Sequence, residues 1–512
     1  MIKKFINKLL GKSSAKAGGT SLGKRVEVPA AEHGIDPQLL DERAVKVVRT
    51  LTDAGFEAYV VGGAVRDLLL GRRPKDFDVA TNATPEQVKQ LFRRAFIIGR
   101  RFRIVHVVYG RGREHEVIEV STFRALLGEA SAERVTGNEK SSKAELAGKA
   151  HVVDESGRVL RDNVWGPQIE DAARRDYTVN AMYYEPQSQL LVDYHGGLKD
   201  LRAKQLRMIG DPETRYREDP VRILRAVRFA AKLGFGIEPA TKAPLRSMAA
   251  LLPNVPASRL FDEMVKLLQT GHGLASLETL KALGLHKGIF PILDAVLAAD
   301  GSLPEGARGA FVKQALQDTD LRVSEGRSVS PSFLLACLLW FDVKARWQVL
   351  RSQGEPTVPA LQQAIDQVFD ARIGDISGRG KLAADMREIW LMQPRFERRT
   401  GSGPYSLVEQ PRYRAGFDFL RLRADVGDAD ATLADWWEDF ALGDEDERTA
   451  LVEDARQHEK RQPRQQISPR TMAADGDASP EPLLDAPAKK RRRRRRPNKG
   501  GKSEGGAAPA AE

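Results

Sequence analysis

A short apolar run that ends in two glycines constrains the fold of this chain more than any other feature. The run Ala58–Val61 has the composition of a β-strand, and Gly62 and Gly63 follow it directly. Residues 64–70 then show helical spacing of apolar side chains, and residues 76–79 alternate charged and apolar, as a half-buried strand does. These patterns predict a strand, a glycine turn, a helix and a second strand.

Further patterns extend this mixed unit and then give way to helices. A helix is expected over residues 39–54 and another from Thr84, while residues 103–109 and 115–122 have the pattern of two more strands. Beyond Asp219 the apolar spacing is helical almost throughout. The predicted fold class is therefore α+β, with a small head that holds a mixed sheet, followed by an all-helical neck and body.

Composition divides the chain into five segments. We expect a flexible leader over residues 1–37, a head over 38–185, a neck over 186–270, a helical body that binds RNA over 271–456, and a disordered basic tail over 457–512. Within the head, residues 126–157 are rich in Ala, Gly, Ser, Lys and Glu and predict a flexible insertion. The basic N-terminus is interpreted as frayed, with a weak interfacial helix as the alternative.

Positive charge is concentrated near the C-terminus. The chain of 512 residues has a net charge of +11, and one uninterrupted run of eight basic residues accounts for most of it: Lys489, Lys490, Arg491, Arg492, Arg493, Arg494, Arg495 and Arg496. Such a run predicts a sequence-neutral hold on an RNA backbone whose affinity falls with salt, because bound counterions are released. A merely solubilising tail is the alternative.

The single cysteine, Cys337, lies in an apolar run that is too short to cross a membrane. One cysteine cannot form a disulfide within the chain, which fits a reducing cytoplasm. We therefore expect a cytoplasmic protein without stable membrane insertion, and Cys337 as a small core residue.

Two aspartates on the second predicted strand suggest a metal site. Asp76 and Asp78 are two residues apart, so their carboxylates point to the same face of a strand. Neighbouring carboxylates repel each other unless a cation lies between them, and oxygen ligands suit Mg²⁺. Two Mg²⁺ ions can stabilise both the attacking and the leaving oxygen of a phosphoryl transfer. Glu119 is the expected third carboxylate, and Glu116, which faces the opposite way, is the alternative.

The glycine turn supplies a matching site for a polyphosphate. Without Cβ atoms, Gly62 and Gly63 let phosphates approach the backbone amides at the start of a helix. Arg66, near the start of that helix, offers a fork-shaped donor for phosphate. An ordinary tight turn is the alternative reading of the two glycines alone.

Residues 219–233 predict a helix with a basic stripe. Asp219 fits the N-cap and Pro220 the first helical position. No acidic side chain follows at i+4, so we expect the stripe to remain unneutralised and to attract an anion. Phe229 lies among the basic residues, where it would stack on a base or shield their stems. At helical spacing the stripe contains Arg222, Arg225, Arg228 and Lys232.

Three motifs carry a resemblance to a known family. Val60-Val61-Gly62-Gly63-Ala64-Val65-Arg66-Asp67, with Lys75-Asp76-Phe77-Asp78-Val79-Ala80-Thr81, resembles the signature of the polymerase-β-like nucleotidyltransferases. It is most similar to the class that holds bacterial CCA-adding enzymes and bacterial poly(A) polymerases. Arg174-Arg175-Asp176-Tyr177-Thr178-Val179-Asn180-Ala181 and Glu218-Asp219-Pro220-Val221-Arg222 resemble the Arg-Arg-Asp-Phe-Thr-Ile-Asn-Ala and Glu-Asp-x-x-Arg elements of that class.

The resemblance implies roles that the residues alone do not. Arg175 would reach the nucleotide, and Asp176 would join the two head aspartates as a functional carboxylate. Asp219 and Arg222 would read the base edge of the incoming nucleotide, because a bidentate arginine contact discriminates between bases. Arg225 and Arg228 are the candidates for contact with its triphosphate.

Several features favour poly(A) addition over CCA addition. Residues 210–219 and 410–420 resemble the bacterial poly(A) polymerase versions, the basic run suits an enzyme that accepts many RNA 3′ ends, and no His-Asp dipeptide of a phosphohydrolase domain occurs. We therefore expect a polynucleotide adenylyltransferase that adds AMP from ATP to RNA, in mRNA processing, transcription and RNA turnover. RNA-degradation machinery is a further expected partner. The alternatives are a CCA-adding enzyme, a non-catalytic RNA-binding protein with a degenerate head, and AMP transfer to a small molecule.

Overall fold

We describe the fold from a computed structural model of the chain. The chain divides into two compact units, Met1–His458 and Glu459–Glu512. No described helix is both long and apolar enough to cross a membrane. The structure describes residues 22–99, 102–111, 114–126, 133–135, 151–154, 159–372 and 380–461.

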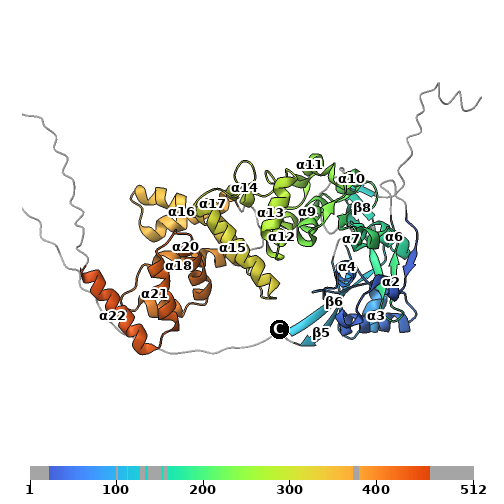
Figure 1. Ribbon diagram of the computed structural model, residues 1–512, viewed down its shortest axis with the longest axis horizontal. Coiled ribbons are helices and arrows are strands. Elements are labelled where there is room, and N and C mark those ends of the chain that lie inside the picture. The colour runs from blue at the N-terminus through green and yellow to red at the C-terminus, as the bar shows by residue number, and fades with distance from the viewer. Residues whose placement is uncertain are drawn as a thin grey trace, which may run out of the picture. The chain divides into compact units, whose positions relative to one another are not determined.

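A mixed sheet of eight strands forms the head (Figure 1). Its strand order is β1-β11-β10-β2-β3-β6-β5-β4. Strands β3 and β6 are parallel, with Asp78 directly opposite Glu119 in the register, and β2 runs antiparallel to β3. The strands are β1 (Val26–Val28), β2 (Ala58–Val61), β3 (Asp78–Thr81), β4 (Ala95–Ile98), β5 (Ile104–Arg111), β6 (Glu114–Thr122), β10 (Met182–Glu185) and β11 (Leu190–Asp193).

Three helices of the head pack their apolar sides against the sheet: α3 (Glu42–Asp53), α4 (Gly63–Leu69) and α5 (Pro85–Leu91). In α3, Ala44, Val47, Val48 and Leu51 recur at helical spacing and are fully buried against the sheet. Burying each Val or Leu contributes about 1.5–3 kcal/mol to the free energy of unfolding. Thr84 caps α5 through a reciprocal pair of hydrogen bonds with Gln87, as its sequence position predicts.

Two predicted boundaries in the head are wrong. The leader predicted over residues 1–37 is too long, because β1 pairs antiparallel with β11 at the edge of the sheet. A strand of three residues whose partner lies far along the chain has no local sequence pattern, so it could not be predicted. The strand predicted over residues 76–79 begins only at Asp78, so Asp76 lies in the bend that precedes β3.

Other predictions fall partly or wholly outside the described residues. Within the predicted insertion 126–157 and just after it, three short strands form a separate sheet: β7 (Glu133–Val135), β8 (His151–Asp154) and β9 (Val159–Asp162). Strand β7 pairs parallel with β8, and β9 pairs antiparallel with it. The flexibility of the rest of that insertion stays a prediction. Residues 1–21 and the basic run 489–496 lie outside the described residues.

The neck centres on α9 (Val221–Leu233), which packs on α12 (Ala257–Gln269) and α13 (Gly273–Ala282). The apolar side predicted for this helix is confirmed, because Ile223, Ala226, Val227 and Ala230 are buried. Its predicted end is also confirmed, since Gly234 has the left-handed φ of 67° that glycine tolerates.

The predicted N-cap of that helix is wrong. Pro220 takes this position in α9, and no side chain caps the helix. Asp219 instead ends the preceding helix, α8 (Pro212–Glu218), and its carboxylate accepts a hydrogen bond from Arg259 at 3.1 Å.

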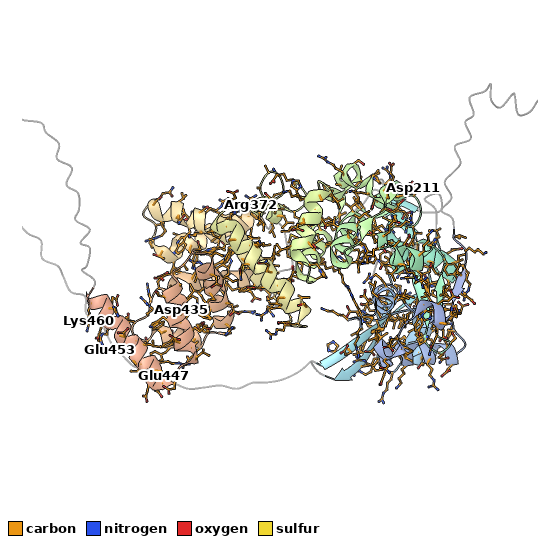
Figure 2. All side chains as sticks on the ribbon, in the orientation of Figure 1. Asp211, Arg372, Asp435, Glu447, Glu453 and Lys460 are labelled. Carbon is orange, nitrogen blue, oxygen red and sulfur yellow. The ribbon has the colours of Figure 1, made fainter. Side chains whose placement is uncertain are left out.

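The body is helical, as predicted, and its helices share buried aromatic side chains. Cys337 is fully buried in this core, which confirms its predicted place. Arg421 joins two of the helices through Asp435 at 2.6 Å and Glu438 at 2.5 Å; Figure 2 shows Asp435 on α21. The longer helices are α15 (Ala307–Ser324), α16 (Pro331–Ser352), α17 (Thr357–Arg372), α18 (Gly380–Phe396), α20 (Tyr413–Asp425), α21 (Ala431–Leu442) and α22 (Glu445–Arg461).

Candidate active site

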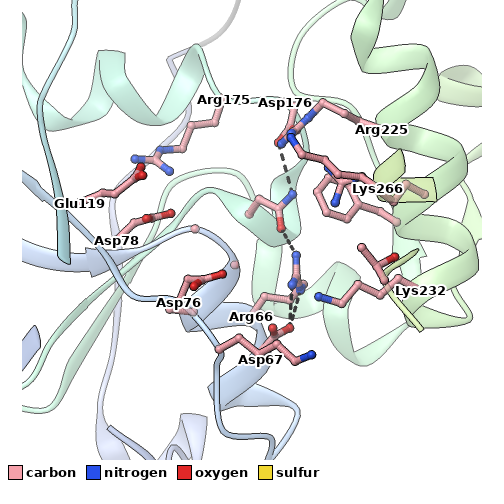
Figure 3. Close-up of a pocket in the computed structure, with 18 of the residues that line it drawn as sticks. Arg66, Asp67, Asp76, Asp78, Glu119, Arg175, Asp176, Arg225, Lys232 and Lys266 are labelled. Atoms are coloured by element: carbon pink, nitrogen blue, oxygen red, sulfur yellow. Dashed lines mark hydrogen bonds and ion pairs between the residues drawn. The ribbon is translucent and has the colours of Figure 1, made fainter. Parts of the chain in front are cut away.

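One cleft of about 1050 Å³ gathers nearly all of the predicted site residues. It lies between the sheet of the head and the helices α9 and α12 of the neck (Figure 3). Only the tail residues 489–496, which lie outside the described part, and the alternative carboxylate Glu116 are missing from its lining. The lining includes Gly62, Gly63, Arg66, Asp76, Asp78, Glu119, Arg175, Asp176, Asp219, Arg222, Arg225 and Arg228.

The glycine turn between β2 and α4 forms one wall of the cleft. Gly62 has φ 72° and ψ −133°, a backbone conformation that only glycine adopts without strain. A Cβ on Gly62 would lie 3.6 Å from Nη1 of Arg175 and 3.8 Å from Oδ2 of Asp78. The turn therefore brings bare backbone close to both an arginine and a carboxylate.

Three carboxylates gather on the sheet side of this turn. Glu119 lies opposite Asp78 on the parallel strands β3 and β6, and Asp76 reaches the cleft from the bend before β3. Burial raises the pKa of Asp78 to about 6, and the negative charges of Glu119 and Asp76 add to the rise while Arg175 opposes it. This corner of the cleft therefore has an excess of negative charge.

The described residues contain no group of three or more His, Cys, Asp or Glu side chains arranged to hold a metal ion. The alternative third carboxylate, Glu116, is exposed outside the cleft and lies 3.4 Å from Nη1 of Arg43. Of the two glutamates, only Glu119 shares the cleft with Asp76 and Asp78.

Arg175 is held in the cleft by a buried polar cluster that the sequence patterns do not reveal. Its guanidinium contacts Oδ2 of Asp171 at 3.1 Å and the hydroxyl of Tyr183 at 3.2 Å. The buried Arg215 donates to the carbonyl oxygens of Arg174 and, at 2.6 Å, of Arg175. These contacts fix both the side chain and the backbone of Arg175, and a pattern of charges along the sequence does not distinguish such a buried arginine from an exposed one.

A chain of hydrogen bonds runs from the glycine-turn helix to α9 (Figure 3). Arg66 donates to Oδ1 of Asp67 at 2.7 Å and to Oδ1 of Asn180 at 2.7 Å. Asn180 in turn donates to Oδ1 of Asp176 at 3.3 Å, and Oδ2 of Asp176 lies 2.6 Å from Nη2 of Arg225. Arg66, predicted as a phosphate donor, thus directs donors from all three of its nitrogens to protein oxygens.

The prediction that the basic stripe of α9 remains unneutralised is wrong for its three arginines, although Lys232 forms no ion pair within the described part of the chain. The partners of the arginines come from α8, from the segment after α6 (Gln168–Ala173) and from α12. None of them lies four residues after its arginine, and Glu218 lies four residues before Arg222. The three pairs are Arg222 with Glu218 at 2.9 Å, Arg225 with Asp176 at 2.6 Å and Arg228 with Glu263 at 3.4 Å.

Phe229 shields the stems of these arginines. It is 6% exposed, and its ring packs edge-on against Tyr177 at 5.8 Å between centroids. The guanidinium carbons of Arg66, Arg225 and Arg228 lie 5.4, 5.1 and 4.6 Å from its centroid. Of the two roles considered for Phe229, the buried position favours shielding over stacking on a base.

A mixed sheet that presents two aspartates beside a glycine turn, facing an arginine-lined helix, defines a nucleotidyltransferase. Comparison with known proteins shows which family of nucleotidyltransferases the chain resembles. Three family descriptions match: "Poly A polymerase head domain" over residues 58–207, "Probable RNA and SrmB- binding site of polymerase A" over 234–297, and "Polymerase A arginine-rich C-terminus" over 353–499.

Individual relatives agree with these descriptions. Poly(A) polymerase I of Haemophilus influenzae is 41% identical over 83% of this chain and 90% of its own length, and that of Salmonella typhi is 38% identical over 88% and 93%. The CCA-adding enzyme of Bacillus subtilis is 37% identical over only 46% of this chain and 53% of its own length. The chain belongs to the bacterial poly(A) polymerase I family.

Proposed function

We propose that this chain adds AMP from ATP to RNA 3′ ends without a template. The observation that carries the proposal is the cleft in which Asp76 and Asp78 lie beside the Gly62 turn. Similarity to poly(A) polymerases over most of the chain supports the same activity.

In the proposed reaction the 3′-hydroxyl oxygen of the RNA forms a bond to the α-phosphorus of ATP. The bond from that phosphorus to the bridging oxygen of the β-phosphate breaks, pyrophosphate leaves and the hydroxyl proton is released. Each cycle lengthens the RNA by one AMP and regenerates a 3′-hydroxyl. No template strand is needed, because protein groups select the base.

We propose that Asp76, Asp78 and Glu119 hold two Mg²⁺ ions. The donor set fits, because all three offer carboxylate oxygens, and burial together with the charges of Glu119 and Asp76 raises the pKa of Asp78. When bound, the ions would stabilise negative charge on the attacking and leaving oxygens. The excess negative charge of this corner would then be compensated.

The chain's own residues would bind and orient the nucleotide. The amides of the Gly62 turn and the fixed guanidinium of Arg175 would bind the triphosphate, since both lie beside Asp78. Asp219 and Arg222 would read the adenine edge, and both line the cleft in fixed orientations, through Arg259 and Glu218 respectively.

We assign the remaining arginines of the motifs a different role from the one first expected. Arg66 and Arg225 would position the turn and α9 rather than contact phosphate, because their donors are directed to Asp67, Asn180 and Asp176. Arg228, paired with Glu263 in the same wall, would act with them.

The wider role is part of the same proposal. It includes the division into domains, with RNA bound by the helical body and by the basic run at 489–496. The RNA-binding family description covers residues 234–297, which include the end of the proposed neck and the start of the proposed body, and the arginine-rich description covers 353–499. The chain would act in mRNA processing, transcription and RNA turnover in the cytoplasm, together with RNA-degradation machinery.

A substrate comparison tests the proposal. The purified chain is given each nucleoside triphosphate alone, and also ATP together with CTP, with either an unstructured RNA or a tRNA that lacks its 3′-terminal CCA. Long products made from ATP alone on the unstructured RNA are the expected result. Addition of two C and one A that stops on the tRNA would establish CCA addition instead, and no incorporation at all would favour a non-catalytic RNA-binding protein.

A further inference from the structure

Four cationic side chains of the cleft differ from its paired arginines in having no carboxylate partner among the described residues. Arg72, Arg73 and Lys75 lie on the loop between α4 and β3, and Lys232 lies in the last turn of α9; all four line the cleft. Among the described residues, no carboxylate lies within ion-pair distance of any of them. We call these four residues the unpaired cations.

The carboxylate of Asp67 forms no ion pair with Lys232. Asp67 acts on Lys232 from a distance, but its Oδ1 already accepts two hydrogen bonds from Arg66. Burial lowers the pKa of Lys232; Asp67 opposes this effect, and the positive charges of Arg66, Arg228 and Lys75 add to it.

The unpaired cations all line the same cleft, where one anionic ligand would meet several of them. Lys75 acts electrostatically on Lys232, and both Lys232 and Arg72 act on the ring of His272. Cations that face one another without counter-charges destabilise the folded state unless an anion lies between them. The arrangement therefore fits a ligand with several negative charges in a row.

The position of the group indicates which anion that is. Lys75 is next to Asp76 in the sequence, so the group begins beside the carboxylate corner. From Lys232 the cleft continues to Lys266, Gln269 and Thr270, at the end of α12. These three residues lie in the segment 234–297 that matches the RNA-binding family description.

We infer that the unpaired cations bind the last phosphodiesters of the RNA 3′ end and hold its hydroxyl beside Asp76 and Asp78. The inference rests on the proposed function, because it concerns the second substrate of the same reaction. The triphosphate of ATP is the competing occupant, and the two differ in which substrate loses affinity when the cations are removed.

Direct binding to the full chain tests the inference. The double variant Arg72→Ala, Lys232→Ala is compared with the wild type and with Lys46→Ala, which removes an exposed cation on α3, away from the cleft. Binding of a short single-stranded RNA and of ATP is measured separately across a range of salt concentrations. The tail is the same in all three proteins, so differences report on the cleft.

The double variant should bind the RNA about tenfold more weakly than wild type. Its slope of log affinity against log salt should fall by about 0.7 for each phosphate that the variant no longer neutralises. ATP binding should be unchanged, and Lys46→Ala should match the wild type in both assays.

Two results would overturn the inference: weaker ATP binding with unchanged RNA binding, or no change in either. Should the double variant fail to fold, Arg72→Gln alone, on the exposed loop, supplies the same comparison. A separate assay distinguishes failure of the proposed function: in that case the wild-type protein binds RNA but incorporates no AMP.

Discussion

Oδ2 of Asp176 lies 2.6 Å from Nη2 of Arg225, and Oδ1 accepts from Asn180. The resemblance to the poly(A) polymerases implied that Asp176 acts together with Asp76 and Asp78. Its contacts instead place it in the hydrogen-bonded chain that joins the glycine-turn helix to α9 (Figure 3). We therefore treat Asp176 as a positioning residue.

Replacement of Asp176 by asparagine should reduce both stability and activity. Asparagine keeps the size of the side chain but leaves Arg225 without its charge partner in a largely buried site. Because the side chain of Arg225 is 33% exposed, we expect a loss of about 2 kcal/mol of unfolding free energy at neutral pH. The KM for ATP should rise, because α9 and the glycine turn lose their connection; denaturant unfolding and steady-state kinetics measure the two effects.

The matched variant is Asp76→Asn. Asp76 is exposed in the cleft, and its negative charge acts on that of Asp78, so its neutralisation should abolish turnover without lowering the unfolding free energy. If Asp176→Asn behaved in the same way, with full stability and no turnover, Asp176 would be a catalytic residue and the positioning role would be wrong.

The Asp176–Arg225 pair should also make stability depend on acid. Burial alone would raise the pKa of Asp176, but the charge and hydrogen bonds of Arg225, helped by Arg222, hold it at about 2. A depressed folded-state pKa stabilises the protein above the ordinary value near 3.8, and this contribution is lost as the pH falls through about 2.

The pair should therefore contribute about 2 kcal/mol at neutral pH. Unfolding free energies of the wild type and Asp176→Asn, measured from neutral pH into acid, should converge as the pH approaches 2. A difference that stays constant over this range would show that the charge of Asp176 does not matter.

The backbone of the glycine turn gives a separate prediction. Gly62→Ala introduces a Cβ at φ 72° and ψ −133°, which strains the turn by about 1–3 kcal/mol, and the new atom faces Arg175 and Asp78. ATP turnover should fall sharply. Gly71→Ala, at φ 68° in open space after α4, is the control and should lose stability while keeping its KM for ATP.

Base selection should depend on the fork of Arg222. Arg222→Lys keeps the charge but loses the planar donor, so preference for ATP over the other nucleoside triphosphates should fall by about tenfold, within the 1–3 kcal/mol of a bidentate contact. Competition of GTP or CTP with ATP measures this preference. Arg217→Lys, on the exposed side of α8, should keep full selectivity; unchanged selectivity in Arg222→Lys would remove Arg222 from base reading.

The sequence predicted the elements whose signals are local. The strand Ala58–Val61 matches β2 residue for residue, and the apolar side of α9 follows from helical spacing. The cleft also contains every predicted site residue that the structure describes, apart from the alternative carboxylate Glu116. These successes depend on short-range patterns and on motifs within single segments.

Predictions failed where distant segments decide the outcome. Asp219 has the chemistry of an N-cap, but Arg259 on α12 provides its partner instead. The arginines of α9 have no local acidic neighbours at i+4, yet Asp176 and Glu263 neutralise two of them in the folded chain. Such partners cannot be found from spacing along one helix, because tertiary packing brings them together.

The most direct test of the account is AMP incorporation by Asp78→Asn, compared with the wild type, on an unstructured RNA with ATP and Mg²⁺. Asparagine has nearly the same shape, so the fold should be retained while the charge beside the Gly62 turn is removed. We predict that the wild type makes a ladder of lengthened products and that Asp78→Asn makes none. A ladder of undiminished length from the variant would contradict the assignment of this cleft as the active site.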